Sequence, residues 1–375
     1  MTINHQVFFY LHHQGSPHKA AFQHGILCLA EGLKELGIPF YSDKNYWQIS
    51  PSHKECLFSY NPEVKPQYCS VVIVSHSWLK YGQGFPKNLF RSDRKYITVY
   101  VDCLDGISPD LWKPEFRQFD LIIRLHFNRK IKYPSNVKPW VMGLSNRIID
   151  STKNPIKFSE RKNKILWNYR VEHNLRAMVK EKILPSLSMI LPVDDSVNDY
   201  KEPELSEQEA LWWKQTGRRH YPDYYANLKS SVATACFGGY LKPPVLFKYS
   251  FPYTYFIKAL NKFFPPSRQI VWQWDSWRFW ESLAAGCVTF HVDFEKYGIQ
   301  LPVMPINYLH YIGIDLDNPE ATVEKISNDP KLLEKVAVAG RRWAIEHYSP
   351  VPTARRFLAL VNSTWSVNYN GITQS

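Results

Sequence analysis

Short apolar runs separated by long polar segments are the feature that most constrains the fold of this chain. Four such runs lie in the first part of the sequence, at residues 7–11, 71–74, 96–101 and 121–125. Each has the length of a buried strand, and the segments between them are long enough for the crossovers that parallel strands need. The first crossover carries apolar residues at helical spacing that end at Gly37. The first 150 residues therefore predict a parallel α/β domain.

The second half repeats this pattern. A polar, basic segment at residues 151–164 is followed by strand-like runs at residues 165–168, 231–237, 287–292 and 311–314, with a helix predicted over residues 276–285. Because 375 residues exceed what one hydrophobic core usually holds, two domains are expected. The predicted organisation is a first domain at 1–150, a linker at 151–164, a second domain at 165–345, and a closing helix at 346–375 that packs back across both.

The charge of the chain points to an anionic partner. There are 46 basic against 34 acidic residues, a formal net charge of +12. A nucleotide diphosphate, an acidic glycan or a membrane surface would all suit this excess. We find no zinc-ligand spacing, RNP-type aromatic motif or recognition-helix pattern, so no nucleic-acid partner is expected.

The cysteines and the N-terminus bear on location. Six cysteines are scattered singly without CxxC pairs, which predicts reduced thiols: Cys28, Cys56, Cys69, Cys103, Cys236 and Cys287. Residues 1–10 lack a basic segment followed by an apolar one, and no stretch of about 18 apolar residues occurs anywhere. We expect a cytoplasmic protein, with peripheral contact to a membrane allowed.

The predicted helix at residues 276–285 carries the most chemistry. Asp275 or Ser276 can cap its start, and Gly286 can take the left-handed position after its end. Arg278 and Glu281 lie three positions apart and so share one helix face. A guanidinium near a helix N-terminus favours a diphosphate, and a carboxylate one turn later can accept ribose hydroxyl protons. The alternative is an ordinary surface ion pair.

This stretch resembles the donor-domain signature of GT-B glycosyltransferases, nearest to the exostosin-like and glycosyl-transferase group 1 families. The resemblance rests on the run from Arg278 to Val288, on Asp293, and on the preceding segment 224–239; it spans about residues 224–315, with a weaker match in the C-terminal helices. It implies a GT-B-like fold, two Rossmann-like parallel-sheet domains facing a cleft, and a nucleotide sugar as co-substrate with no cofactor.

The resemblance also implies roles for individual residues. Glu281 would hold the ribose, Arg278 the diphosphate beside Ser276, and Gly238 and Gly239 would let the backbone approach the donor. Two features depart from the family pattern. Many group 1 retaining enzymes have a glutamate where this chain has Gln273, and an insertion at residues 240–269 separates the two glycines from the helix.

Further candidates follow from position alone. Arg170 lies after the strand at 165–168, where such a domain presents cations to a diphosphate; a solvated arginine is the alternative. An inverting reaction would need a general base from the first domain. His18 and Asp102 are best placed among the histidines and aspartates near the predicted strand ends, a set that also holds His24, His76 and Asp105. A retaining reaction would need no base there.

The expected reaction is transfer of a hexosyl or related group from a nucleotide sugar to a glycan or lipid-linked acceptor. No bound metal is expected, because no acidic pair of the DxD type follows a predicted strand. The alternative is a non-catalytic relative that binds a glycan or a partner protein. The insertion at 240–269 is rich in aromatic, proline and basic residues, and it suits a lid, a platform for sugar rings or a membrane-facing patch.

Overall fold

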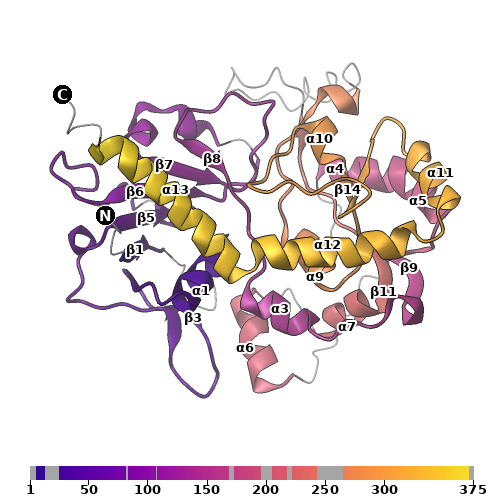
Figure 1. Cartoon of the computed structure of the whole chain (residues 1–375), viewed down its shortest axis with the longest axis horizontal. Helices are drawn as coiled ribbons and strands as arrows, with labels where there is room; N and C mark the ends of the chain where they lie inside the picture. Colours follow the sequence, from indigo (N-terminus) through magenta and orange to yellow (C-terminus); the bar gives the residue numbers. More distant parts are fainter. Residues whose placement is uncertain are drawn as a thin grey trace.

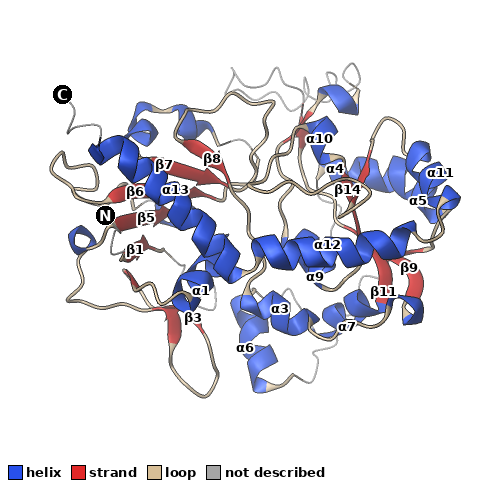
Figure 2. Ribbon diagram, in the orientation of Figure 1, coloured by secondary structure: helices blue, strands red, loops and turns tan. Residues whose placement is uncertain are grey.

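The computed structural model describes residues 6–12, 25–81, 83–106, 108–168, 173–195, 205–217, 222–242 and 265–370. Two parallel sheets, one in each half of the chain, organise these residues (Figures 1 and 2). We name each sheet with its helices the first unit and the second unit. The predicted α/β fold class with two Rossmann-like sheets is confirmed.

The first sheet is parallel throughout, with the order β2-β1-β5-β6-β7-β8. Its strands are β1 Val7–Tyr10, β2 Phe40–Ser42, β5 Val71–Ser75, β6 Ile97–Asp102, β7 Leu121–Arg124 and β8 Val137–Pro139. Every residue of β5 and β6 is buried, as expected for central strands covered on both faces. The four predicted strands form the middle of the sheet, and the two short strands that the sequence did not reveal lie at its edges.

The second sheet is also parallel, with the order β10-β9-β11-β14-β15. Its strands are β9 Lys162–Leu166, β10 Val193–Asp194, β11 Ser231–Ala235, β14 Val288–Val292 and β15 Ile312–Ile314. Two small antiparallel pairs join β3 Tyr46–Gln48 to β4 Cys56–Phe58, and β12 Leu241–Lys242 to β13 Ile270–Val271. The second pair closes the ends of the predicted insertion, whose residues 243–264 lie outside the described residues.

Helices cover both sheets. They are α1 Leu27–Glu35, α2 His76–Lys80, α3 Asn146–Thr152, α4 Asn174–Met178, α5 Leu184–Ser188, α6 Glu207–Gln215, α7 Pro222–Ser230, α9 Trp277–Ala284, α10 Phe294–Tyr297, α11 Glu320–Asn328, α12 Leu332–Tyr348 and α13 Pro350–Asn370. Short 3₁₀ turns span Pro66–Tyr68, Pro109–Trp112, Pro114–Gln118, Phe158–Glu160 and Pro266–Arg268, and a π turn spans Val179–Ile183.

The last helix returns to the first unit. Figure 1 shows α12 along the second unit and α13 continuing across the first. Helix α13 packs on α1, and its Ala354, Phe357 and Val361 are buried in the core of the first unit, where Phe357 meets Trp140 edge to face. Apolar burial of this kind is the main force that holds such a helix in place. The two C-terminal helices therefore connect the units, α12 on the second and α13 on the first.

The sequence also supports predictions about the cysteines and about membrane-spanning segments. All six cysteines are free thiols, four of them buried. Among the described residues, no helix combines the length and the apolar character that a membrane span requires.

Candidate functional site

Helix α9 begins and ends where the sequence predicts. Ser276 is its N-cap residue and Gly286 follows its end in the left-handed conformation, with φ of 70°. The side chain of Ser276 makes no capping hydrogen bond. The carboxylate of Asp275 turns away from the helix start instead, because it accepts hydrogen bonds from Nε1 of Trp280 at 2.6 Å and from the backbone N–H of Met142 at 2.7 Å. Asp275 thus joins α9 to the chain that leaves the first unit.

The carboxylate of Glu281 lies in the interior, contrary to the expectation that it faces a ligand. Its side chain is fully buried; one oxygen accepts from the Tyr224 hydroxyl at 2.9 Å and the other from the Tyr225 hydroxyl at 2.8 Å. Arg147 of α3 donates to the Tyr225 hydroxyl and lies 3.5 Å from Glu281. Burial raises the pKa of both tyrosines well above the ordinary value. We name Arg147, Tyr224, Tyr225 and Glu281 the closed cluster.

Arg278 does not pair with Glu281. It is half-buried, and its Nε donates to the backbone carbonyl of Asn168, just beyond β9. The two charges that the sequence places on one helix face therefore have different neighbours. Arg278 reaches toward the carboxyl end of the second sheet, the edge at which open α/β sheets bind ligands.

Gly238 and Gly239 follow β11 and are packed tightly against the segment before α9. A Cβ on Gly238 would lie 2.0 Å from the backbone oxygen of Gln273, and a Cβ on Gly239 would lie 2.0 Å from its side-chain Oε1. The backbone N–H of Gly239 also donates to the Gln273 carbonyl at 3.1 Å. A larger residue at Gly238 would therefore clash with backbone, whereas one at Gly239 would require the side chains of Gln273 and His173 to move.

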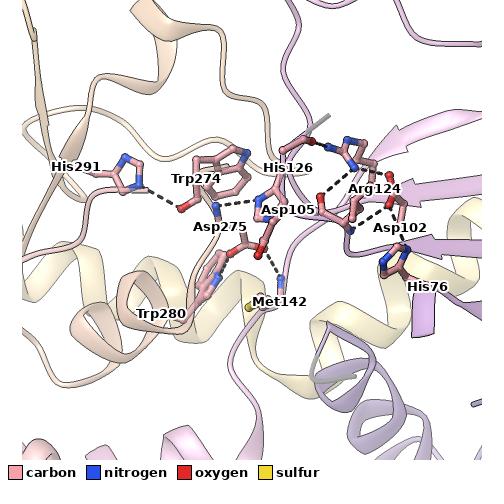
Figure 3. A network of polar contacts seen from close by, with 12 residues as sticks. His76, Asp102, Asp105, Arg124, His126, Met142, Trp274, Asp275, Trp280 and His291 are labelled. Carbon is pink, nitrogen blue, oxygen red and sulfur yellow. Dashed lines mark hydrogen bonds and ion pairs between the residues drawn. The ribbon is translucent and has the colours of Figure 1, made fainter. Parts of the chain in front are cut away.

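A chain of polar contacts crosses the junction of the two units (Figure 3). His126 follows β7 in the first unit, and its Nδ1 accepts the backbone N–H of Asp275 at 3.2 Å. Its Nε2 therefore carries the hydrogen and donates to Asp105 at 3.1 Å. His126 and Asp275 are buried, whereas the side chain of Asp105 is 55% exposed. We name Asp105, His126, Asp275 and Trp280 the junction network.

The two carboxylates of the junction network have opposite pKa shifts. Burial raises the pKa of Asp275 to about 6 against the opposing effects of His126 and its hydrogen bonds. For Asp105, burial also acts upward, but hydrogen bonds from His126 and Gln273 outweigh it and hold the pKa below its ordinary value. Asp105 is therefore an ionised carboxylate that His126 and Gln273 orient and that reaches solvent. Such a group can accept a proton from a bound hydroxyl.

Asp102 lies at the end of β6 as predicted, but the structure encloses it. Its carboxylate is buried and ion-paired with Arg124, which also donates to the backbone oxygens of Leu104 and Gly106. An enclosed carboxylate cannot reach an acceptor hydroxyl, so the prediction of Asp102 as the base is corrected here. The pair instead fixes the loop that carries Asp105.

Of the remaining candidates, the structure describes only His76. His76 is half-buried and hydrogen-bonds through Nδ1 to the Tyr100 hydroxyl at 3.0 Å; burial lowers the pKa of its imidazole. His18, His24 and Arg170 lie outside the described residues. Among the residues that the structure describes, no group of three or more His, Cys, Asp and Glu side chains is arranged to hold a metal ion.

The site also contains residues that the sequence analysis missed. His126 directly follows the predicted strand at 121–125, so the rule that selected Asp102 at the end of a strand also applies to it. Arg147 had no such signal, because its partner Glu281 lies 134 positions away and the two meet only through packing.

Comparisons with known proteins give structural neighbours only. No protein-family model and no curated protein matches the chain. Among solved structures, it is similar to a glycosyltransferase from Rickettsia africae ESF-5, with 12% identity over 96% of this chain and 98% of that chain and a TM-score of 0.49. It is also similar to AviGT4, a glycosyltransferase involved in avilamycin A biosynthesis, with 11% identity over 96% and 98% and a TM-score of 0.48. An α-glucosyltransferase solved with UDP and a DNA 13-mer aligns with 11% identity over 95% and 99% and a TM-score of 0.49.

Proposed function

We propose that the protein is a glycosyltransferase that moves a sugar from a nucleotide-sugar donor to a glycan or lipid-linked acceptor, without a bound metal or cofactor. The observation that carries the proposal is the exposed carboxylate of Asp105, held by His126 at the junction of two parallel α/β units. The GT-B resemblance of the segment around α9 supports the same reaction. We expect it to take place in the cytoplasm, with peripheral membrane contact where the acceptor is lipid-linked.

Asp105 is the proposed general base of an inverting transfer. The acceptor hydroxyl oxygen forms the new bond to the anomeric carbon, the bond from that carbon to the diphosphate oxygen breaks, and the hydroxyl proton passes to Asp105. The leaving diphosphate takes the electron pair. His126 and Gln273 hydrogen-bond the carboxylate of Asp105 and orient it, while its side chain stays 55% exposed and so can meet the acceptor.

Arg278 and the start of α9 are the proposed diphosphate contacts. A guanidinium and the free amides of a helix N-terminus both favour an anion. Ser276 supports this role because its hydroxyl makes no capping bond in the helix. Gly238 and Gly239 remain proposed donor neighbours, since they lie on the same loop edge as Gln273.

Donor binding is tested by thermal unfolding with UDP-, GDP-, ADP- and CMP-sugars. A donor present at one hundred times its Kd should stabilise the fold by about 2.7 kcal/mol. Arg278→Ala should weaken that donor roughly tenfold or more, because it removes a charged hydrogen bond. The matched control is Arg342→Ala, which removes an exposed arginine of α12. Stabilisation by none of the four nucleotide classes would rule the proposal out.

Catalysis is tested at Asp105 with the donor that binds. Asp105→Asn should lower kcat by about 10²- to 10⁴-fold with little change in donor affinity, because the amide cannot accept the proton. Asp93→Asn, which alters an exposed carboxylate paired with Arg91, should leave kcat unchanged. Activity should persist in excess chelator. Loss with chelator and recovery with manganese would contradict the metal-independent part.

A second candidate function has its own support. Glu281, the expected ribose contact, is enclosed by Tyr224 and Tyr225, and Gln273 stands where many relatives have a glutamate. Both features suit a non-catalytic relative that binds a glycan or a partner protein. Binding of a donor without any turnover, in wild type and in Asp105→Asn alike, would favour this candidate.

A further inference from the structure

A cavity of about 460 Å³ lies among α3, α6 and α7. Its volume falls in the range of small-molecule sites. The described residues that line it are Arg147, Asp150, Ser151, Lys153, Ser206, Gln208, Glu209, Trp212, Thr216, Tyr225, Ala226 and Lys229. None of the proposed donor or base residues is among them.

Arg147 forms a rigid part of the cavity wall. Its side chain lines the cavity but is only 3% exposed, and its guanidinium lies over the rings of Tyr225 and Trp277. One terminal nitrogen donates to Tyr225 and the other lies 3.5 Å from Glu281, so the guanidinium is fixed in position.

The charges of the lining nearly balance. The lining contains two lysines, Lys153 and Lys229, and two acids, Asp150 and Glu209, while Arg147 is already paired with Glu281. A near-neutral lining gives a free anion no net attraction. It offers both hydrogen-bond donors and acceptors, which is what a polyhydroxylated ligand needs.

Trp212 adds a flat apolar surface of fixed position. It lines the cavity and also packs against the core of the first unit. Sugar rings present C–H faces that pack on aromatic rings while their hydroxyls hydrogen-bond at the edge. We propose that this cavity is a saccharide-binding site separate from the junction network, and this inference does not depend on the transferase proposal.

The elements around the cavity are held by both units. Helix α6 is tied to the first unit, because the backbone N–H of Gln48 donates to Gln215 at 2.7 Å and Gln215 donates back at 3.0 Å. Helix α7 and Arg147 contact the second unit through Glu281 of α9. A bound saccharide would therefore touch elements held by both units.

The test is saturation-transfer NMR on the full chain with glucose, galactose, mannose and N-acetylglucosamine as probes. At least one probe should give signals, and Asp150→Asn and Lys229→Gln should each weaken its binding roughly three- to tenfold through loss of one hydrogen bond. Trp212→Ala should abolish the signals. Both Asp150 and Lys229 are at least partly exposed, so their variants keep the test valid if Trp212→Ala fails to fold.

The controls are carboxylates outside the lining. Asp223→Asn, an exposed change on α7, and Asp93→Asn, an exposed change in the first unit, should leave the signals unchanged. No signal from any of the four sugars, or signals that survive all three cavity variants, would overturn the proposal. Thermal stabilisation by inorganic phosphate that Lys229→Gln removes, without sugar binding, would identify an anion site instead and overturn it equally.

Discussion

The closed cluster and the junction network each contain a residue of α9, and they differ in how far their carboxylates are exposed. In the closed cluster, Glu281 is fully buried and tyrosine hydroxyls hold both of its oxygens. In the junction network, buried His126 holds one oxygen of Asp105, whose side chain remains 55% exposed. One carboxylate is enclosed by the fold, and the other is oriented by the fold and reaches solvent.

This difference shows which carboxylate can act on a ligand. A buried, fully hydrogen-bonded charge contributes to the position of the helices around it, and removing its partner leaves an uncompensated charge. An exposed carboxylate with one fixed oxygen contributes little to stability but has a defined direction. The comparison predicts that damage to the two groups will affect different measurements.

The largest expected effect concerns the closed cluster. Arg147→Met should lower the free energy of unfolding by about 3–5 kcal/mol, because Glu281 would remain buried without its cation. Urea denaturation measures this value. Asp105→Asn is the matched change in the junction network and should cost less than about 1 kcal/mol. Equal losses in the two variants would remove the distinction between enclosed and exposed carboxylates.

The next effect is pH dependence at the chain that passes between the units. Glu31 accepts a hydrogen bond from the backbone N–H of Asn146 at 2.7 Å, and burial raises the pKa of Glu31 to about 8. Asp275 accepts a hydrogen bond from the backbone N–H of Met142, and burial raises the pKa of Asp275 to about 6. The folded state therefore keeps these protons to higher pH than the unfolded state does. Stability is highest below the unfolded pKa values, near 4, and falls as pH rises through 6 and 8.

Urea denaturation between pH 5 and pH 8 should show this fall, on the order of a few kcal/mol. Glu31→Gln keeps an oxygen that can accept from Asn146 but cannot ionise, so it should flatten the fall above pH 6. The exposed carboxylate of Asp93 offers the control variant Asp93→Asn, which should keep the wild-type slope. Stability that rises with pH in the wild type would contradict the buried, protonated state of Glu31.

A smaller effect should separate the two glycines beside Gln273. A Cβ on Gly238 would meet backbone atoms, which cannot move independently, so Gly238→Ala should cost about 1–3 kcal/mol or more. Gly239→Ala meets the side chains of Gln273 and His173, which can rotate away, and should cost less. Urea denaturation of the two variants compares them directly. A greater loss for Gly239→Ala would show that the Gln273 side chain, and with it the contact to Asp105, is rigidly held.

The sequence allows prediction of the elements of this fold better than of its contacts. The central strands and the limits of α9 follow from apolar runs, a capping position and Gly286, all of which are local signals. The direction of Glu281 is not local, because it depends on Arg147 and on a tyrosine pair from another helix. Spacing shows which residues share a helix face, but not what that face packs against.

The same limit explains the outcome at the ends of the strands in the first unit. The position of Asp102 after β6 could be predicted, yet its burial depends on Arg124 of the neighbouring strand. Asp105 gains its hydrogen bonds from His126 and Gln273, which come from the two units and meet only when these pack together. Sequence position puts Asp102 and Asp105 near the end of the same strand, but only tertiary packing decides that Asp102 is enclosed and Asp105 reaches solvent.

The smallest expected effect tests whether Ser276 has a structural role in α9. Replacing an N-cap serine by alanine usually costs about 1 kcal/mol, because a helix N–H loses its acceptor. Ser276 makes no such bond, whereas Ser206 at the start of α6 forms a capping box with Glu209. Ser276→Ala should therefore change the free energy of unfolding by less than about 0.5 kcal/mol, against about 1 kcal/mol for Ser206→Ala.

If Ser276→Ala nevertheless weakens nucleotide-sugar binding, the hydroxyl of Ser276 contacts the ligand at the start of the helix. A loss of stability equal to that of Ser206→Ala would instead make it an ordinary cap and restrict the proposed diphosphate contacts to Arg278 and the backbone.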